Sequence, residues 1–102
     1  MQNTPVASYS LTVRVTIANK PGMLGKVTSA IGEAGGDIGA VDLVEAGQKE
    51  MTRDITFKSS DEAHAQRIVE RLRGVPDVTV VNVSDRTFLM HLGGKIEVNG
   101  RV

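Results

Sequence analysis

Residues 9–17 alternate between apolar and polar side chains, and this alternation constrains the fold more than any other feature of the chain. Successive side chains of a β-strand point to opposite faces, so a period of two indicates a strand with one buried face and one more hydrated face. The side chains expected on the buried face are Leu11, Val13, Val15 and Ile17. The rest of the chain must therefore supply elements that cover one face of a sheet.

Two later segments have the periodicity of amphipathic helices. The first is expected to begin near Pro21 and to end at Gly35 and Gly36, because proline is tolerated at the start of a helix and glycine is common just after its end. The second is expected to begin at Ser59, which forms a capping box with Glu62. The predicted buried stripes are Leu24, Val27, Ile31 and Ala34 in the first helix and Ala65, Ile68, Val69 and Leu72 in the second.

Three further segments are predicted strands: residues 37–45, 51–58 and 77–85. The order is then β-α-β-β-α-β, the split βαβ arrangement of the ferredoxin-like fold. We expect an α+β domain with one four-stranded antiparallel sheet and both helices on a single face, since each helix has one apolar stripe to bury.

The same patterns divide the chain into three parts. Residues 1–8 are interpreted as a flexible leader and residues 9–85 as the domain, while residues 86–102 begin a new apolar segment and are interpreted as the truncated start of a linker or catalytic region. No apolar run approaches the roughly 20 residues that cross a bilayer. We therefore expect no membrane partner and a cytoplasmic location.

Charge and residue content disfavour several classes of function. The 12 basic residues balance the 12 acidic ones, so no net charge favours binding to nucleic acid. The absence of cysteine rules out disulfides, thiolate catalysis and cysteine metal sites. An RNA-binding module of this topology would need exposed aromatic side chains for base stacking, and the chain has one tyrosine and two phenylalanines.

The sequence also argues against catalysis by this chain alone. No nucleophile–base pair and no pair of carboxylates converges in the sequence, and the first loop has Lys20 where a phosphate-ester hydrolase of this size would want an arginine. His64 has no second histidine or cysteine near it to complete a metal site, so we interpret it as a surface or boundary residue. We expect no catalytic residue, metal site or cofactor in the chain.

The turn from Asn19 to Leu24 is the strongest candidate for a binding site. Gly22 lets the backbone approach a bound group closely, and the amides that follow Pro21 form an anion site at a helix start. Asn19 offers both a donor and an acceptor at the edge of this site. A plain strand-to-helix turn explains the same residues, because asparagine, proline and glycine are all turn formers.

The residues around this turn resemble the opening of an ACT domain. The matching segments are Val15 to Val27 and Ala34 to Ile38, and the resemblance extends over residues 10–85. It implies a module that binds an amino acid or another small metabolite where the first loop of one subunit meets the second strand of a neighbour, and that regulates an attached enzyme. The effector-binding residues implied are Asn19, Pro21, Gly22, Met23, Leu24, Asp37 and Ile38.

The segment from His91 to Val98 is similar to the segment that leads into the catalytic region of bacterial malic enzymes. This similarity implies that the chain is the N-terminal regulatory domain of such an enzyme. It also implies that the missing part binds NAD(P) and a divalent metal and catalyses the decarboxylation of malate. An additional edge strand or a disordered stub explains the same residues.

Three hypotheses about function remain open. In the first, an effector binds at a dimer seam and regulates the attached enzyme, although Asn19 stands where the family often has aspartate and makes a weaker contact to an ammonium group. In the second, the chain is a pure oligomerisation domain that forms a homodimer through an edge strand, the second one, where Gly39 and Ala40 allow close approach. An independent hydrolase or RNA-binding domain is the third alternative.

Overall fold

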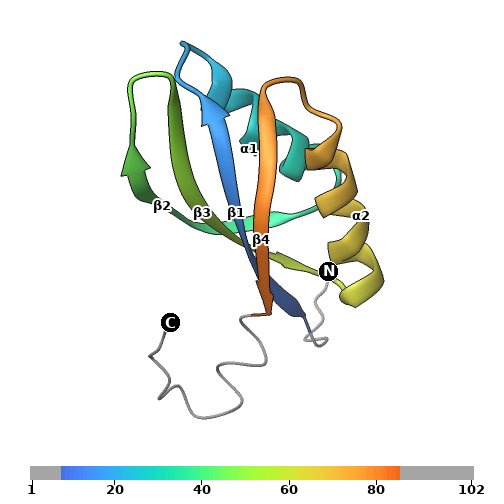
Figure 1. Ribbon diagram of the computed structural model, residues 1–102. Coiled ribbons are helices and arrows are strands. Elements are labelled where there is room, and N and C mark those ends of the chain that lie inside the picture. The colour runs from blue at the N-terminus through green and yellow to red at the C-terminus, as the bar shows by residue number, and fades with distance from the viewer. Residues whose placement is uncertain (1–7, 86–102) are drawn as a thin grey trace, which may run out of the picture.

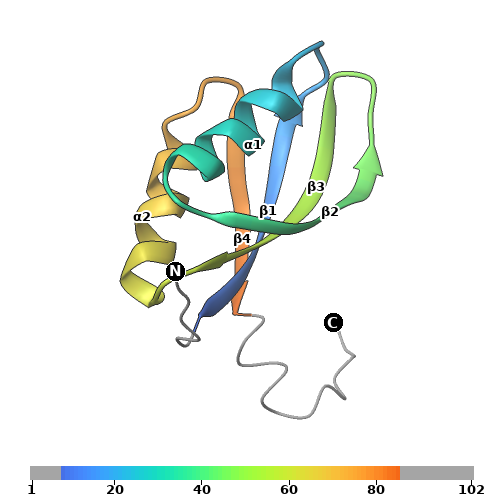
Figure 2. The ribbon, with the colours of Figure 1, turned by 180° about the vertical axis from the view of Figure 1, so that it is seen from behind.

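The computed structural model describes residues 8–85, which form two helices and one four-stranded sheet. The elements in chain order are β1 (Tyr9–Ala18), α1 (Met23–Glu33), β2 (Asp37–Ala46), β3 (Glu50–Ser59), α2 (Glu62–Arg73) and β4 (Val78–Asp85). Both helices lie on the same face of the sheet, which is the far side in Figure 1 and the near side in Figure 2. The predicted βαββαβ fold is confirmed.

The strands follow the spatial order β2-β3-β1-β4, and all neighbouring pairs are antiparallel. The central strand pair runs in regular register from Tyr9 opposite Ser59 to Ala18 opposite Glu50. Strand β2 is an edge of the sheet, as predicted, and its pairing with β3 shifts register at two places, between Ile38 and Ala40 and again after Leu43.

The core lies between the sheet and the helices and is almost entirely aliphatic. The alternation of β1 produces this directly, because Leu11, Val13, Val15 and Ile17 are each at most 3% exposed. Phe57 of β3 is the largest side chain that is fully buried. The helices add the side chains Met23, Val27, Ala30, Ile31, Ala65, Ile68, Val69 and Leu72. Burial of this apolar surface is the main force that holds the helices on the sheet.

Helix α1 ends as the sequence predicts. Gly35 has a φ of 90°, a left-handed conformation that glycine adopts without strain. The next amide, of Gly36, donates to the carbonyl of Ile31 at 2.8 Å. A Cβ on Gly36 would lie 2.6 Å from Cγ2 of Ile31. Because Gly36 has no side chain, the backbone that follows α1 can pack directly against the core.

The predicted capping box at the start of α2 is wrong. The N-cap is Asp61, whose carboxylate accepts a hydrogen bond from the amide of His64 at 2.8 Å. Ser59 is instead 5% exposed, and its hydroxyl shares its one proton between the carbonyls of Tyr9 and Asp61, at 3.2 and 2.9 Å. A buried serine needs such partners, and a capping position two residues later has a better acceptor in its carboxylate.

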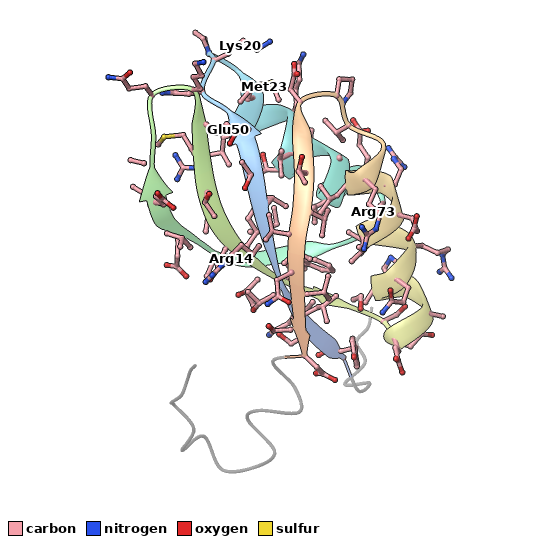
Figure 3. All side chains as sticks on the ribbon, in the orientation of Figure 1. Arg14, Lys20, Met23, Glu50 and Arg73 are labelled. Carbon is pink, nitrogen blue, oxygen red and sulfur yellow. The ribbon has the colours of Figure 1, made fainter. Side chains whose placement is uncertain are left out.

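The face of the sheet away from the helices is polar. Arg14 of β1 donates two hydrogen bonds, of 2.8 and 3.0 Å, to the carboxylate of Asp54 directly across on β3. This contact raises the pKa of the Arg14 guanidinium. Thr12 and Thr56 form a second cross-strand pair at 2.7 Å. Figure 3 shows Arg14 on this face.

Tyr9 should titrate near pH 12 in the folded chain. Its hydroxyl donates to Oδ2 of Asp85 at 2.7 Å, and this hydrogen bond, with a smaller effect of burial, raises its pKa from 10.0 to about 12. The bond therefore stabilises the fold fully below about pH 10, and its contribution is lost as the pH rises through 12. Absorbance at the wavelength of tyrosinate measures this directly, because the chain has one tyrosine.

Asp85→Asn is the matched variant for this titration. It keeps the size of the side chain and removes the charge, so we expect the midpoint to move back toward the ordinary value near 10. An unchanged midpoint in the variant would show that the Asp85 carboxylate does not hold the proton on Tyr9.

The predicted leader and tail are not tested by the fold. Residues 1–7 and 86–102 lie outside the described residues, and the segment from His91 to Val98 lies with them. Within residues 8–85, neither helix is long and apolar enough to span a membrane.

Candidate functional site

The turn between β1 and α1 is held by its own backbone. The amide of Lys20 donates to the carbonyl of Ala18 at 2.9 Å, and the amide of Met23 donates to the carbonyl of Lys20 at 3.3 Å. Gly22 is the N-cap of α1 and has a φ of 84°, which favours glycine at this position. Pro21 therefore precedes the cap, whereas the sequence places it near the first helical residue.

A small pocket of about 80 Å³ lies beside this turn. It is lined by Ile17, Ala18, Asn19, Lys20, Met23, Leu24, Met51 and Arg53. Its volume corresponds to two or three water molecules at roughly 30 Å³ each, which is the size of a ligand head group. Figure 3 shows Lys20 at the tip of the turn and Met23 below it, toward the sheet.

The structure brings together part of the predicted site. Asn19, Met23 and Leu24 line the pocket. Met23 is only 4% exposed and belongs to the core, so its contribution is to the floor of the pocket. Pro21 and Gly22 lie in the exposed turn beside the pocket without lining it.

The two predicted residues of β2 lie elsewhere in the same chain. Asp37 and Ile38 pair with Lys58 and Phe57, at the end of β3 opposite to Met51. Asp37 is exposed, while Ile38 is partly buried against the core. One chain therefore does not bring these two residues to the turn.

Asn19 has a structural contact that the sequence did not reveal. Its side-chain amide donates to the carbonyls of Gly47 and Gln48, at 3.2 Å each, in the loop between β2 and β3. Its backbone amide donates to the carbonyl of Lys49 at 2.9 Å. Asn19 thus joins the β1–α1 turn to the β2–β3 loop, and an aspartate could not make the two side-chain bonds because a carboxylate has no N–H.

Asn19→Asp should lower the free energy of unfolding by about 1–2 kcal/mol, because two hydrogen bonds are lost and a carboxylate then faces two carbonyls. For a domain of this size the melting temperature should fall by roughly 4–16 °C. Thermal unfolding followed by circular dichroism measures the change. Asn82→Asp is the control, since Asn82 is exposed and its one side-chain bond, to Ser84, is long at 3.4 Å. Equal stability of the two variants would contradict the role of Asn19.

Sequence reasoning missed the contribution of β3 to the pocket. Met51 pairs directly with Ile17, and Arg53 pairs with Val15, so both β3 residues lie on the helix side of the sheet. The alternation of β1 and β3 shows which side chains of each strand share a face. It does not show which residues of β3 lie beside the turn, because this depends on the register of the two strands.

The edge strand β2 carries an exposed apolar surface. Val41, Leu43 and Val44 are 36%, 52% and 43% exposed, respectively. In Figure 2 the helices cover the sheet from β4 toward β1 and leave the later half of β2 uncovered. An exposed edge strand with apolar side chains is suited to pairing with another strand.

His64 joins the two helices. Its Nδ1 accepts from the amide of Ser60 at 3.0 Å, so the ring proton is on Nε2, which donates to the carbonyl of Ala34 at 2.7 Å. The ring thus provides hydrogen-bond partners for a backbone carbonyl at the end of α1 and for a backbone amide just before α2. Within residues 8–85, no group of three or more histidine, aspartate or glutamate side chains is placed to hold a metal ion.

The fold and the turn define the class of protein. The family model of the ACT domain matches residues 5–82, and the chain belongs to this family. The crystal structure of the ACT domain from GTP pyrophosphokinase of Chlorobium tepidum has the same fold, with a TM-score of 0.61 over 76% of this chain and 97% of that domain at 19% identity.

Two proteins with similar sequences are bacterial malic enzymes. The chain is 40% identical over 96 residues to the NAD-dependent malic enzyme of Geobacillus stearothermophilus, covering 94% of this chain and 20% of the enzyme. It is 33% identical over 92 residues to NAD-dependent malic enzyme 1 of Bacillus subtilis, covering 89% of this chain and 21% of the enzyme. The predicted resemblance to both families is confirmed. The chain spans about a fifth of the length of these curated relatives.

Proposed function

We propose that the chain is a regulatory module that binds a small-molecule effector and controls an attached enzyme of the malic enzyme type. The observation that carries this proposal is the pocket at the β1–α1 turn, which is lined by Asn19, Met23 and Leu24 of the predicted site. The similarity to malic enzymes, of which this chain spans about a fifth, supports a catalytic part elsewhere in the protein.

The complete site, in this proposal, is formed between two copies of the chain. If two β2 edges pair antiparallel about a two-fold axis, the start of one β2 lies beside the end of the other. The end of β2 lies opposite Met51, which lines the pocket. The pairing therefore moves Asp37 and Ile38 of the partner subunit toward the turn, which a single chain cannot do.

The catalytic chemistry is assigned to the remainder of the protein. In this proposal NAD(P) and a divalent metal would be bound there, as the names of the NAD-dependent malic enzymes that the chain resembles suggest for the cofactor. The role of this chain is to change the activity of that part when effector binds. Coupling between two such sites is typically about 1–3 kcal/mol.

A pure oligomerisation domain is the second candidate. The exposed apolar side chains of β2 favour it, because they suit pairing of two copies whether or not a ligand is bound. Under this candidate the pocket at the turn has no ligand, and only the state of association would affect the attached enzyme.

A panel of amino acids and central metabolites, tested at millimolar concentration by thermal shift, separates the two candidates. A ligand that binds only the folded chain raises its melting temperature, by an amount equivalent to about 2.7 kcal/mol at a concentration of 100 Kd. We expect at least one compound to do so. A dimer that no compound stabilises would favour the pure oligomerisation domain.

A further inference from the structure

Arg53 is a charged residue on the apolar side of the sheet. It lies on β3 between Val15 of β1 and Leu43 of β2 in the cross-strand register, and both of these point to the helix side. Val15 is fully buried, and Arg53 itself is partly buried. A cation in such surroundings is unfavourable unless it has an anionic partner or keeps contact with water.

No such partner exists for Arg53 within residues 8–85, where its side chain takes part in no hydrogen bond or ion pair. The acids of the neighbouring strands belong to the other face. Asp54 binds Arg14 there, and Asp42 pairs with Asp54 in the register of β2 and β3. Both carboxylates of β3, Glu50 and Asp54, therefore lie on the side of the sheet opposite to Arg53.

The pocket beside Arg53 has the charge and the size of a carboxylate site. Its lining includes two cations and no acid. Lys20 is paired with Asp77 at 3.1 Å, so Arg53 is the cation of the pocket that has no acidic partner in the part of the chain described. The volume of about 80 Å³ suits a carboxylate with one or two carbon atoms.

We propose that Arg53 binds a carboxylate group of the effector, which makes the effector an organic acid rather than a neutral or purely cationic compound. This inference rests on the proposed effector site at the same pocket. The planar guanidinium donates two parallel hydrogen bonds to a carboxylate, a geometry that lysine does not provide. The carboxylate of the ligand then serves as the anionic partner that Arg53 does not have within residues 8–85. Arg53 also lies directly across from Leu43 in the register of β2 and β3, so a loss of packing by its aliphatic stem must be separated from the loss of charge in any test.

The test uses four probes on the 102-residue chain: succinate, L-aspartate, the neutral succinamide and the diamine putrescine. Isothermal titration gives Kd for each, with wild type, Arg53→Met and Arg67→Met. Arg53→Met keeps an unbranched aliphatic stem at this position and removes the charge. Arg67 is an exposed arginine of α2, so its variant is the same chemical change away from the pocket.

We expect at least one of the two carboxylates to bind wild type and Arg67→Met equally, and to bind Arg53→Met about 10- to 100-fold more weakly. The signal of the Arg53 side-chain Nε should shift on binding in a nitrogen-detected spectrum. Binding of succinamide or putrescine instead, or a carboxylate affinity in Arg53→Met within twofold of wild type, would overturn the role of Arg53 and leave the effector site standing. Failure of all four probes to bind would count against both.

Discussion

Replacing Gly22 with glutamate should abolish effector binding while the two copies remain associated. The residue lies next to the pocket, and the new carboxylate would oppose an anionic ligand near Arg53. Like charges placed together cost several kcal/mol, so we expect the affinity to fall at least about 100-fold, equivalent to roughly 2.7 kcal/mol. Titration calorimetry measures the affinity, and light scattering measures the association.

The variant should still fold. A Cβ at Gly22 would have no atom within 4 Å, so the cost is limited to the left-handed backbone, about 1–2 kcal/mol. Gly32→Glu is the control, because this glycine also has open space around it and lies near the other end of α1. If Gly22→Glu and Gly32→Glu bound the effector equally well, the turn would not be part of the site.

The double variant Leu43→Lys and Val44→Lys should dissociate the proposed dimer. Both side chains are exposed on the edge strand of the single chain, so its own stability should change by less than about 0.5 kcal/mol for each substitution. In a two-fold pairing that places the start of one β2 beside the end of the other, the lysines of each copy would lie opposite Gly39 and Ala40 of the partner subunit, and a cation in such an apolar contact is unfavourable. We expect the association to weaken at least about 100-fold, as measured by analytical ultracentrifugation.

Val81→Lys is the matched control for this experiment. Val81 is 56% exposed and lies on β4, the opposite edge of the sheet. Association through β2 requires that this variant remain a dimer. Dissociation by Val81→Lys, with the double variant of β2 still associated, would place the interface on β4 and would contradict the proposed seam.

The fold could be predicted because its local signals agree. The alternation of residues 9–17 gave both the strand and its buried face, and the glycines after α1 gave the end of that helix. The start of α2 was less accurate, because Ser59 and Asp61 are both good capping residues. The tertiary contact of Ser59 with Tyr9, together with the carboxylate acceptor of Asp61, decides between them.

The site was predicted less completely, for a physical reason. The turn stands out in the sequence because proline and glycine constrain the backbone locally. Met51 and Arg53 join it through the register of two strands that lie more than 30 residues apart, and this register follows from packing rather than from any local motif. The side-chain bonds of Asn19 to the β2–β3 loop were hidden in the same way, since they join segments whose positions are set by the sheet.

A mixture of two variants tests most directly whether the effector site is shared between copies. Gly22→Glu removes the turn half of the site, and Asp37→Trp places a bulky side chain in the half contributed by β2 of the partner subunit, where Asp37 is exposed in the single chain. Neither variant alone should bind the organic acid that binds wild type. A mixed dimer has one site with both defects and one site with none.

The decisive measurement is the binding stoichiometry by calorimetry after the two variants have been mixed and allowed to exchange subunits. If the site is shared between two copies, binding should return with the affinity of wild type, at one site per mixed dimer. If the mixture binds no better than the separate variants while exchange is complete, the turn and β2 of the partner subunit do not form one site.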